Sequence, residues 1–207
     1  MKNPWLMIPA SDYENHMSSP EVQQAQFLSA KLKEVIADVK PDSVLIAGCS
    51  TGNGFEHLTN TCVRKVIGVD INRSYLDILR KRFTCRLKDL QLICSNIEEC
   101  ELPKESVDLI HCGLVFEYIE IGKSLEKICS WLSKGGVLSV ILQMPSEKHK
   151  SVTETKYVSL KGLETIMHLV DPEQFNEAAV NAGYKIGNNK IETLESGKQF
   201  YVATYRK

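Results

Sequence analysis

The sequence predicts an α/β fold, a three-layer sandwich around a mostly parallel seven-stranded sheet that ends in an antiparallel hairpin. Three observations predict it. Short apolar runs alternate with amphipathic segments along most of the 207 residues, a rhythm typical of βαβ units and of a parallel sheet covered on both faces. Two extended stretches near the C-terminus are joined by only four residues, so they must pair antiparallel. The length suits one domain, and we place no boundary within residues 1–207.

The strands are predicted from short continuous apolar runs, because strands buried on both faces of a parallel sheet are apolar throughout. The five parallel strands are expected at residues 43–47, 65–70, 90–94, 107–111 and 137–142. A helix over residues 172–182 then precedes the two hairpin strands, residues 184–194 and 199–205. The remaining crossover segments carry apolar residues at helical spacing and are predicted as the covering layers.

The N-terminal part is expected to contain a helix over residues 18–40. Ser19 can cap free amide groups, and Pro20 is tolerated in a first helical turn. Residues 1–17 have no regular apolar period but carry Trp5, Tyr13 and His16. Two interpretations stay open for this segment: a lid that closes over a ligand, or a tail that packs its aromatic side chains.

Composition narrows the class of protein. Apolar residues make up 43% and charged residues 25%, as in soluble globular proteins. Twenty-five basic against 26 acidic residues give a net charge of −1, which argues against a general nucleic-acid binder. No apolar run approaches the roughly 20 residues of a membrane span, and no secretory apolar core follows the N-terminus. The seven dispersed cysteines include no Cys-x-x-Cys pair, so we expect a reducing, cytoplasmic setting. The five histidines lack metal-ligand spacing.

A glycine-rich turn, residues 48–54, follows the first predicted strand. Ligands of open α/β sheets lie at the carboxyl ends of the strands, and glycine lets the backbone approach them closely. Asp70 ends the second strand, where an acid can accept hydrogen bonds from both ribose hydroxyls of an adenosine-type cofactor. The dinucleotide fingerprint fails because Ser50 and Asn53 stand where it needs glycine, and the phosphate-binding loop fails because its lysine is missing.

Four segments in order resemble the motifs of class I S-adenosylmethionine-dependent methyltransferases. They are V-L-I-A-G-C-S-T-G-N-G at 44–54, G-V-D-I-N at 68–72, V-D-L-I-H-C-G-L-V-F-E-Y-I at 107–119 and L-S-K-G-G-V-L-S-V at 132–140. The resemblance covers roughly residue 28 to the C-terminus and implies a Rossmann-like fold with S-adenosyl-L-methionine as cofactor. Ala47 stands where the family often carries an acid, and Ser50 replaces the usual middle glycine. More weakly, residues 1–17 resemble the N-terminal part of small bacterial methyltransferases.

The same resemblance implies which residues contact the cofactor. They are Gly48, Cys49, Ser50, Gly52, Asp70, Ile71, Asn96, Ile97, His111 and Cys112. Ile71 would lie against the adenine, and Asn96 would reach its amino group; a simple turn role for Asn96 stays open. His111 and Cys112 would lie beside the methionine end, through their backbone more than their side chains. We expect a side chain introduced at Gly52 to point into the cofactor space.

Methyl transfer from a sulfonium is an in-line displacement, so the protein mainly aligns the reactants and excludes water. A general base is needed only if the acceptor must lose a proton. The candidate catalytic residues are Tyr13, His16, Glu117, Tyr118 and Tyr157. For Glu117 a helix-capping role stays open, and for residues 143–159 a plain surface loop.

The favoured function is an enzyme that methylates a small molecule. The alternative is a binding module that keeps the cofactor, lacks turnover and serves a partner protein. A nicotinamide-dependent oxidoreductase is disfavoured by the failed fingerprint, and the near-neutral charge does not favour a nucleic-acid acceptor. The acceptor and the oligomeric state cannot be read from the sequence.

Overall fold

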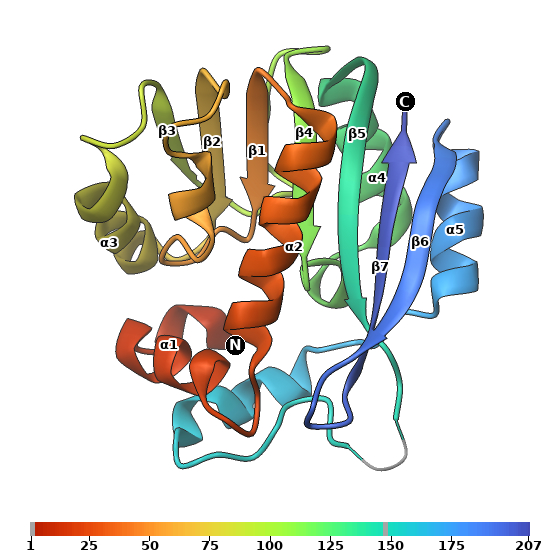
Figure 1. The fold of residues 1–207 in the computed structure, drawn as a ribbon. Coiled ribbons are helices and arrows are strands. Elements are labelled where there is room, and N and C mark those ends of the chain that lie inside the picture. The colour runs from red at the N-terminus through yellow and green to blue at the C-terminus, as the bar shows by residue number, and fades with distance from the viewer. Residues whose placement is uncertain (1–2, 147–148) are drawn as a thin grey trace.

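The computed structural model describes residues 3–146 and 149–207, and it contains the predicted seven-stranded sheet (Figure 1). The strand order is β3-β2-β1-β4-β5-β7-β6. The strands are β1 (Ser43–Ala47), β2 (Lys65–Asp70), β3 (Leu90–Cys94), β4 (Val107–Gly113), β5 (Leu132–Gln143), β6 (Lys185–Thr193) and β7 (Gln199–Arg206). Strands β1 to β5 pair in parallel, and β7 pairs antiparallel with both β5 and β6. The prediction of a mostly parallel sheet that ends in an antiparallel hairpin is therefore confirmed.

Helices cover both faces of this sheet. The α-helices are α1 (Ala10–Ser18), α2 (Gln24–Val39), α3 (Arg73–Phe83), α4 (Ile121–Trp131) and α5 (Pro172–Asn181), and the 3₁₀ helices are η1 (Pro4–Met7), η2 (Phe55–Leu58), η3 (Phe116–Tyr118) and η4 (Val158–Thr165). Alternate residues of β1 face opposite ways: Val44 and Ile46 pack with α2 and α3, whereas Leu45 and Ala47 pack with α4 and α5. The apolar run of β1 thus serves two cores, as expected for a strand buried on both faces.

The N-terminal helix differs from the expectation for residues 18–40. Helix α1 ends at Ser18, a turn follows, and α2 begins only at Gln24. Gln23 lies in the left-handed region with φ of 52°, which interrupts a continuous helix at this point. Ser19 accepts backbone hydrogen bonds from Val22 and Gln23 through its carbonyl, so it closes the turn and does not cap α2.

Two crossovers also differ from a regular strand–helix alternation. Both crossover segments were predicted to be helical, but only the short η2 lies between β1 and β2, and residues 95–106 between β3 and β4 form no helix. The fifth strand was predicted over residues 137–142, but β5 also includes residues 132–136. Gly135 there has φ of +76°, and the register shifts between the partners of Val107 and Leu109. The glycine turn is therefore an irregularity within β5.

A further layer, which we call the cap, lies beyond the carboxyl ends of the parallel strands (Figure 1). The cap consists of residues 3–18 and 149–170, in which η1 and α1 both contact η4. Its apolar centre is small, with Ile8, Val152, Leu160 and Leu163 buried. In the part of the chain that the structure describes, no helix has both the length and the apolar character to cross a membrane.

Candidate functional site

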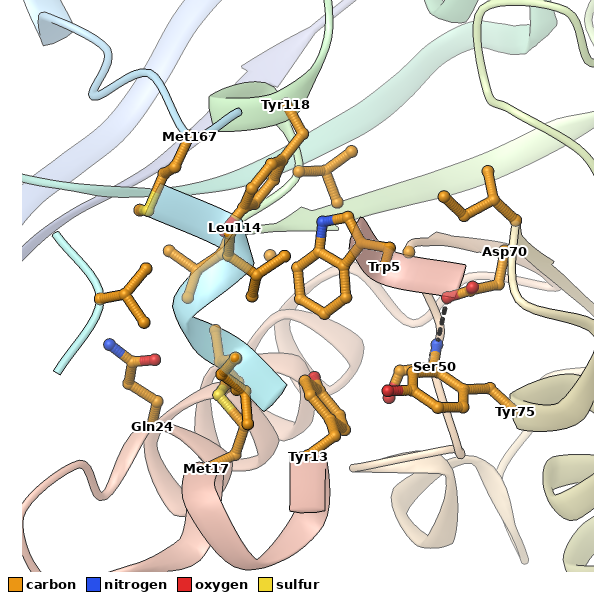
Figure 2. Close-up of a pocket in the computed structure, with 18 of the residues that line it drawn as sticks. Trp5, Tyr13, Met17, Gln24, Ser50, Asp70, Tyr75, Leu114, Tyr118 and Met167 are labelled. Carbon is orange, nitrogen blue, oxygen red and sulfur yellow. Dashed lines mark hydrogen bonds between the residues drawn. The ribbon is translucent and has the colours of Figure 1, made fainter. Parts of the chain in front are cut away.

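A cavity of about 210 Å³ lies between the cap and the carboxyl edge of the sheet. The residues predicted as site residues that line it are Gly48, Ser50, Asp70, Ile71, Asn96, Ile97, Tyr13, His16 and Tyr118. Figure 2 shows Trp5 and Tyr13 in its middle, with Asp70 and Ser50 to one side and Gln24, Met17 and Met167 to the other. The fold therefore brings the ends of β1 and β2 together with the N-terminal segment around one space.

The glycine turn is held against the end of β2 by Asp70. The backbone N–H of Ser50 donates to Oδ2 of Asp70 over 2.8 Å, and the N–H of Asn72 donates to Oδ1 over 2.8 Å. Gly48 has φ of +61°, and a Cβ at this position would lie 2.9 Å from Cγ2 of Val115. Ser50 adopts φ of 45° although it is not glycine. A left-handed residue is thus needed at position 50, which is where related motifs carry a glycine.

Asp70 serves the turn and faces the cavity at the same time. Its side chain is half-buried, and burial raises its pKa, while the amide N–H groups of Asn72 and Ser50 act in the opposite direction. Each carboxylate oxygen has two lone pairs. The backbone amide of Ile71 also donates to this carboxylate, so with three amide donors on four lone pairs an acceptor position remains for a ligand.

Asn96 has the turn role that the sequence left open, and it also faces the cavity. Its Oδ1 accepts from the backbone N–H of Glu98 over 3.2 Å, and its Nδ2 donates to Oε2 of Glu98 over 3.0 Å, which makes it a turn residue. It also lines the cavity beside Ile97 and Ile71. These three residues form the wall next to the end of β2.

Several predicted site residues lie outside the cavity lining. Within the described residues these are Cys49, Gly52, His111, Cys112, Glu117 and Tyr157. Cys49 and Cys112 are buried in the two cores. Nδ1 of His111 lies 3.0 Å from Oγ of Ser139, and burial lowers the pKa of His111 to about 4. The side chain of His111 is therefore a neutral core group at neutral pH.

The expected direction of a side chain at Gly52 is wrong. A Cβ on Gly52 would lie 3.0 Å from Cε2 of Phe83 and 3.1 Å from Cγ of Leu79. Both belong to α3, so a side chain here would enter the packing beneath the turn. Gly52 has φ of +97°, and this backbone conformation determines that a Cβ would point toward α3.

Three of the five candidate catalytic residues reach the cavity. Burial raises the pKa of Tyr13 to about 12 and also raises that of Tyr118, so both phenols remain neutral donors. Nδ1 of His16 lies 2.9 Å from Oγ1 of Thr155. Burial lowers the pKa of His16, and the charge of Lys198 lowers it further. His16 is therefore a neutral imidazole at neutral pH, and such a group can accept a proton.

The N-terminal part of the cap is tied to the glycine turn and to α3. Glu14 accepts hydrogen bonds from the guanidinium of Arg82 and from the hydroxyl of Thr51. Nδ2 of Asn72 donates to the carbonyl of Trp5 over 2.9 Å, and the hydroxyl of Tyr75 donates to the carbonyl of Ile8 over 3.0 Å. These bonds connect the cap directly to both sides of the turn.

Aromatic rings fill the space beneath this part of the cap. The ring centroid of Trp5 lies 5.9 Å from that of Tyr13 and 5.2 Å from that of Tyr118. The ring of Tyr13 lies 5.5 Å from that of Tyr75. Tyr75, a buried residue of α3, also lines the cavity.

Glu117 is a fully buried carboxyl group behind the cavity wall. Its Oε1 accepts from the backbone N–H of Gln143 over 2.8 Å, while Oε2 has no hydrogen-bond partner among the described residues. Burial raises its pKa from 4.5 to about 7, and its charge helps to raise the pKa of Cys112. It caps no helix and does not face the cavity, so its effect is expected on stability.

Replacing Glu117 by glutamine is expected to flatten the pH dependence of unfolding. Charging this buried group costs nothing below about pH 4.5 and reaches its full cost above about pH 7, so wild-type stability falls as the pH rises through this window. A shift of this size corresponds to roughly 3 kcal/mol. Glu117→Gln, which mimics the protonated acid, should melt about 6–12 °C higher than wild type at pH 8 and at nearly the same temperature at pH 4.5. Thermal melts of both proteins at the two pH values check this. The same change of melting temperature with pH in wild type and Glu117→Gln would contradict it.

The comparisons agree with this geometry. Residues 45–140 match the model of a family described as "Methyltransferase domain". A solved S-adenosylmethionine-dependent methyltransferase from Mesorhizobium loti is 15% identical, with 84% of this chain and 96% of that chain covered and a TM-score of 0.62. One from Methanosarcina mazei is 14% identical, with 84% and 96% covered and a TM-score of 0.64. No curated protein matches the sequence.

A third solved structure, the [4+2]-cyclase SpnF, is 14% identical, with 86% of this chain and 80% of that chain covered and a TM-score of 0.66. At such identities these structures show the fold alone. Residues 45–140 thus match a methyltransferase domain, and the chain shares its fold with S-adenosylmethionine-dependent methyltransferases. The domain match from β1 into β5 and the shared fold imply a methyltransferase that uses S-adenosyl-L-methionine as its cofactor.

Three polar residues of the cavity wall were missed by the sequence reasoning. Gln24, Gln143 and Lys198 line the cavity and are buried. Gln24 lay within a predicted amphipathic helix, Gln143 at the start of a candidate loop and Lys198 in the hairpin turn. No local pattern distinguishes them from surface residues, because only packing of the cap against the hairpin buries them.

Proposed function

We propose that this methyltransferase transfers a methyl group in line to a small-molecule acceptor held in the cavity beneath the cap. The observation that carries the proposal is the enclosure of this cavity. Residues 1–17, as far as the structure describes them, and η4 cover the carboxyl edge of the sheet, where the glycine turn and Asp70 lie. A macromolecular acceptor would need an open face at this position.

The residues at the carboxyl edge of the sheet offer the chemical groups that the cofactor needs. Gly48 presents bare backbone to the cavity, and Asp70 retains an acceptor position for a ribose hydroxyl. Ile71, Asn96 and Ile97 offer an apolar wall and an amide at the expected adenine side. When bound, the cofactor supplies an activated methyl group on a sulfonium. The protein then has to orient the acceptor and exclude water.

The cap residues would supply that orientation. Tyr13 and Tyr118 remain neutral and can donate a hydrogen bond to the acceptor. His16 is the neutral base of the cavity wall, so it would take the proton of an acceptor that must lose one. Glu117 and Tyr157 lie outside the lining and are given no role in the transfer.

We further propose that residues 1–17 act as a lid. The cavity of about 210 Å³ is smaller than the roughly 300–1,000 Å³ of typical ligand pockets, because Trp5 and Tyr13 occupy its middle (Figure 2). Entry of a cofactor and an acceptor therefore requires these rings to move. Closure afterwards would exclude water from the transfer.

Replacing Trp5 by alanine is expected to lower turnover by roughly ten- to a hundredfold, because a loosened lid misaligns the acceptor. Affinity for S-adenosylhomocysteine should change little, since the glycine turn and Asp70 are untouched. Met7→Ala is the matched control, because Met7 lies in the same η1 but is 63% exposed. The check is kcat beside calorimetric Kd for each variant. A wild-type kcat in Trp5→Ala would show that residues 1–17 are a packed tail and not a lid.

The proposed function is tested by incubating the protein with methyl-labelled cofactor and cell extract. The expected result is label in the small-metabolite fraction. Label in protein or RNA would contradict a small-molecule acceptor. Binding of S-adenosylhomocysteine without labelling of any fraction would instead favour the binding module that serves a partner.

A further inference from the structure

One end of the cavity holds a buried cation. Lys198, in the turn between β6 and β7, is 4% exposed and lines the cavity. Its Nζ donates to the carbonyl oxygen of Ser151 over 3.1 Å. Among residues 3–146 and 149–207, no carboxylate oxygen forms an ion pair with this ammonium group, although eight other lysine and arginine side chains form such pairs.

Neutral polar groups surround Lys198. The Nε2 of Gln143 donates to the same carbonyl of Ser151 over 2.9 Å, and the Nε2 of Gln24 lies 3.5 Å from Oε1 of Gln143. His16 is close enough for the charge of Lys198 to lower its pKa. All of these residues line the cavity. They offer hydrogen-bond donors and a positive charge but no countercharge.

This polar end is separated from the expected cofactor end. Figure 2 shows Gln24 and Asp70 on opposite sides of Trp5 and Tyr13. The lining also includes the apolar side chains of Leu28, Leu114, Val152, Leu160 and Met167. A ligand that extends from the transfer site to Lys198 would therefore have an apolar body and one polar terminus.

Burial of an unpaired ammonium group is unfavourable by several kcal/mol, so proteins pair such charges. Burial lowers the pKa of Lys198 to about 8, which still leaves most of the group protonated at pH 7. Two of its three N–H donors have no hydrogen-bond partner among the residues that the structure describes. An anionic ligand group would supply both the missing charge and the missing acceptors.

We propose that the methyl acceptor is a carboxylic acid with an apolar body, and that its carboxylate pairs with Nζ of Lys198 beside Gln143 and Gln24. This inference rests on the proposed function, because it names the acceptor class of the same cavity. The carboxylate would anchor the acceptor at one end, so that its other end lies at the transfer site.

The experiment uses full-length protein saturated with S-adenosylhomocysteine. Benzoate, phenylacetate, 3-phenylpropanoate and octanoate are titrated by calorimetry, each against its primary amide. At least one acid is expected to bind wild type about tenfold or more tightly than its amide. Lys198→Met should remove that preference and keep the affinity for S-adenosylhomocysteine. Lys161→Met, at an exposed lysine of η4, is the control and should behave as wild type.

Three results would overturn the inference. The first is equal binding of acids and amides, or binding of none of the acids, by wild type. The second is an unchanged acid preference in Lys198→Met. The third is loss of S-adenosylhomocysteine affinity in Lys198→Met, which would assign the ammonium group to the carboxylate of the cofactor. Failure of wild type to bind S-adenosylhomocysteine at all would overturn the proposed function itself.

Discussion

Replacing Asp70 by alanine is expected to weaken binding of S-adenosylhomocysteine at least tenfold. The proposed ribose contact is a hydrogen bond to a charged acceptor, worth about 1.5–3 kcal/mol, and a tenfold change in Kd corresponds to about 1.4 kcal/mol. The variant also removes the acceptor of the Ser50 and Asn72 amides. The melting temperature should therefore fall as well. Calorimetry and thermal melts on the same samples measure both effects.

Asp70→Asn separates the ligand role from the turn role. The amide keeps one acceptor oxygen, but its NH₂ group must face either the Ser50 or the Asn72 N–H, because each now donates to a different carboxylate oxygen. We expect an affinity between those of wild type and Asp70→Ala. A lower melting temperature with unchanged affinity in Asp70→Ala would show that Asp70 only fixes the turn.

Gly52→Val is expected to destabilise the protein by roughly 2–5 kcal/mol. A residue with a side chain in a left-handed conformation costs about 1–2 kcal/mol, and overpacking costs about 1–3 kcal/mol more. The overpacking arises because a Cβ would lie only 3.0 Å from Phe83 and 3.1 Å from Leu79. For a chain of this size the melting temperature should fall by about 4–20 °C.

Gly183→Val is the matched control for backbone strain. Gly183 has φ of +93°, close to the +97° of Gly52, but no atom lies within 4 Å of a Cβ built there. The difference between the two melting temperatures therefore isolates the clash with α3. Folded Gly52→Val should still bind S-adenosylhomocysteine. Two results would contradict this packing: equal melting temperatures of Gly52→Val and Gly183→Val, or a stable Gly52→Val that no longer binds S-adenosylhomocysteine. Either would show that the side chain at position 52 points into the cofactor space.

Much of the fold was predictable because its signals are local. A strand buried on both faces is apolar along most of its length, and the predicted bounds of β1 and β2 are confirmed. The bounds of β3 are confirmed as well, although this edge strand is only partly buried. The turn at Gly48 and the acid at the end of β2 could be placed for the same reason. The turn directly follows β1, and the acid is the last residue of β2. Because the two strands are parallel, their carboxyl ends lie at the same edge of the sheet.

Other features depend on contacts between distant segments. The start of α2 is set by a left-handed residue in the turn from α1. The glycine turn at Gly135 lies within β5 as an irregularity between Leu132 and Val137, which both pair with β4. Apolar periodicity cannot anticipate either feature, because both arise from how neighbouring elements join and pack.

The sequence by itself was enough to predict the α/β sheet, the positions of the glycine turn and Asp70 at the strand ends, and the class of cofactor. Only the tertiary structure decided which side chains face the cavity. His111 and Cys112 follow the expected motif, yet β4 is so deeply enclosed that both side chains lie in the protein interior. His16 and Lys198 are 182 residues apart and line one cavity. Their proximity results from the antiparallel hairpin and the cap folding over the same sheet edge, and no local pattern encodes such a long-range contact.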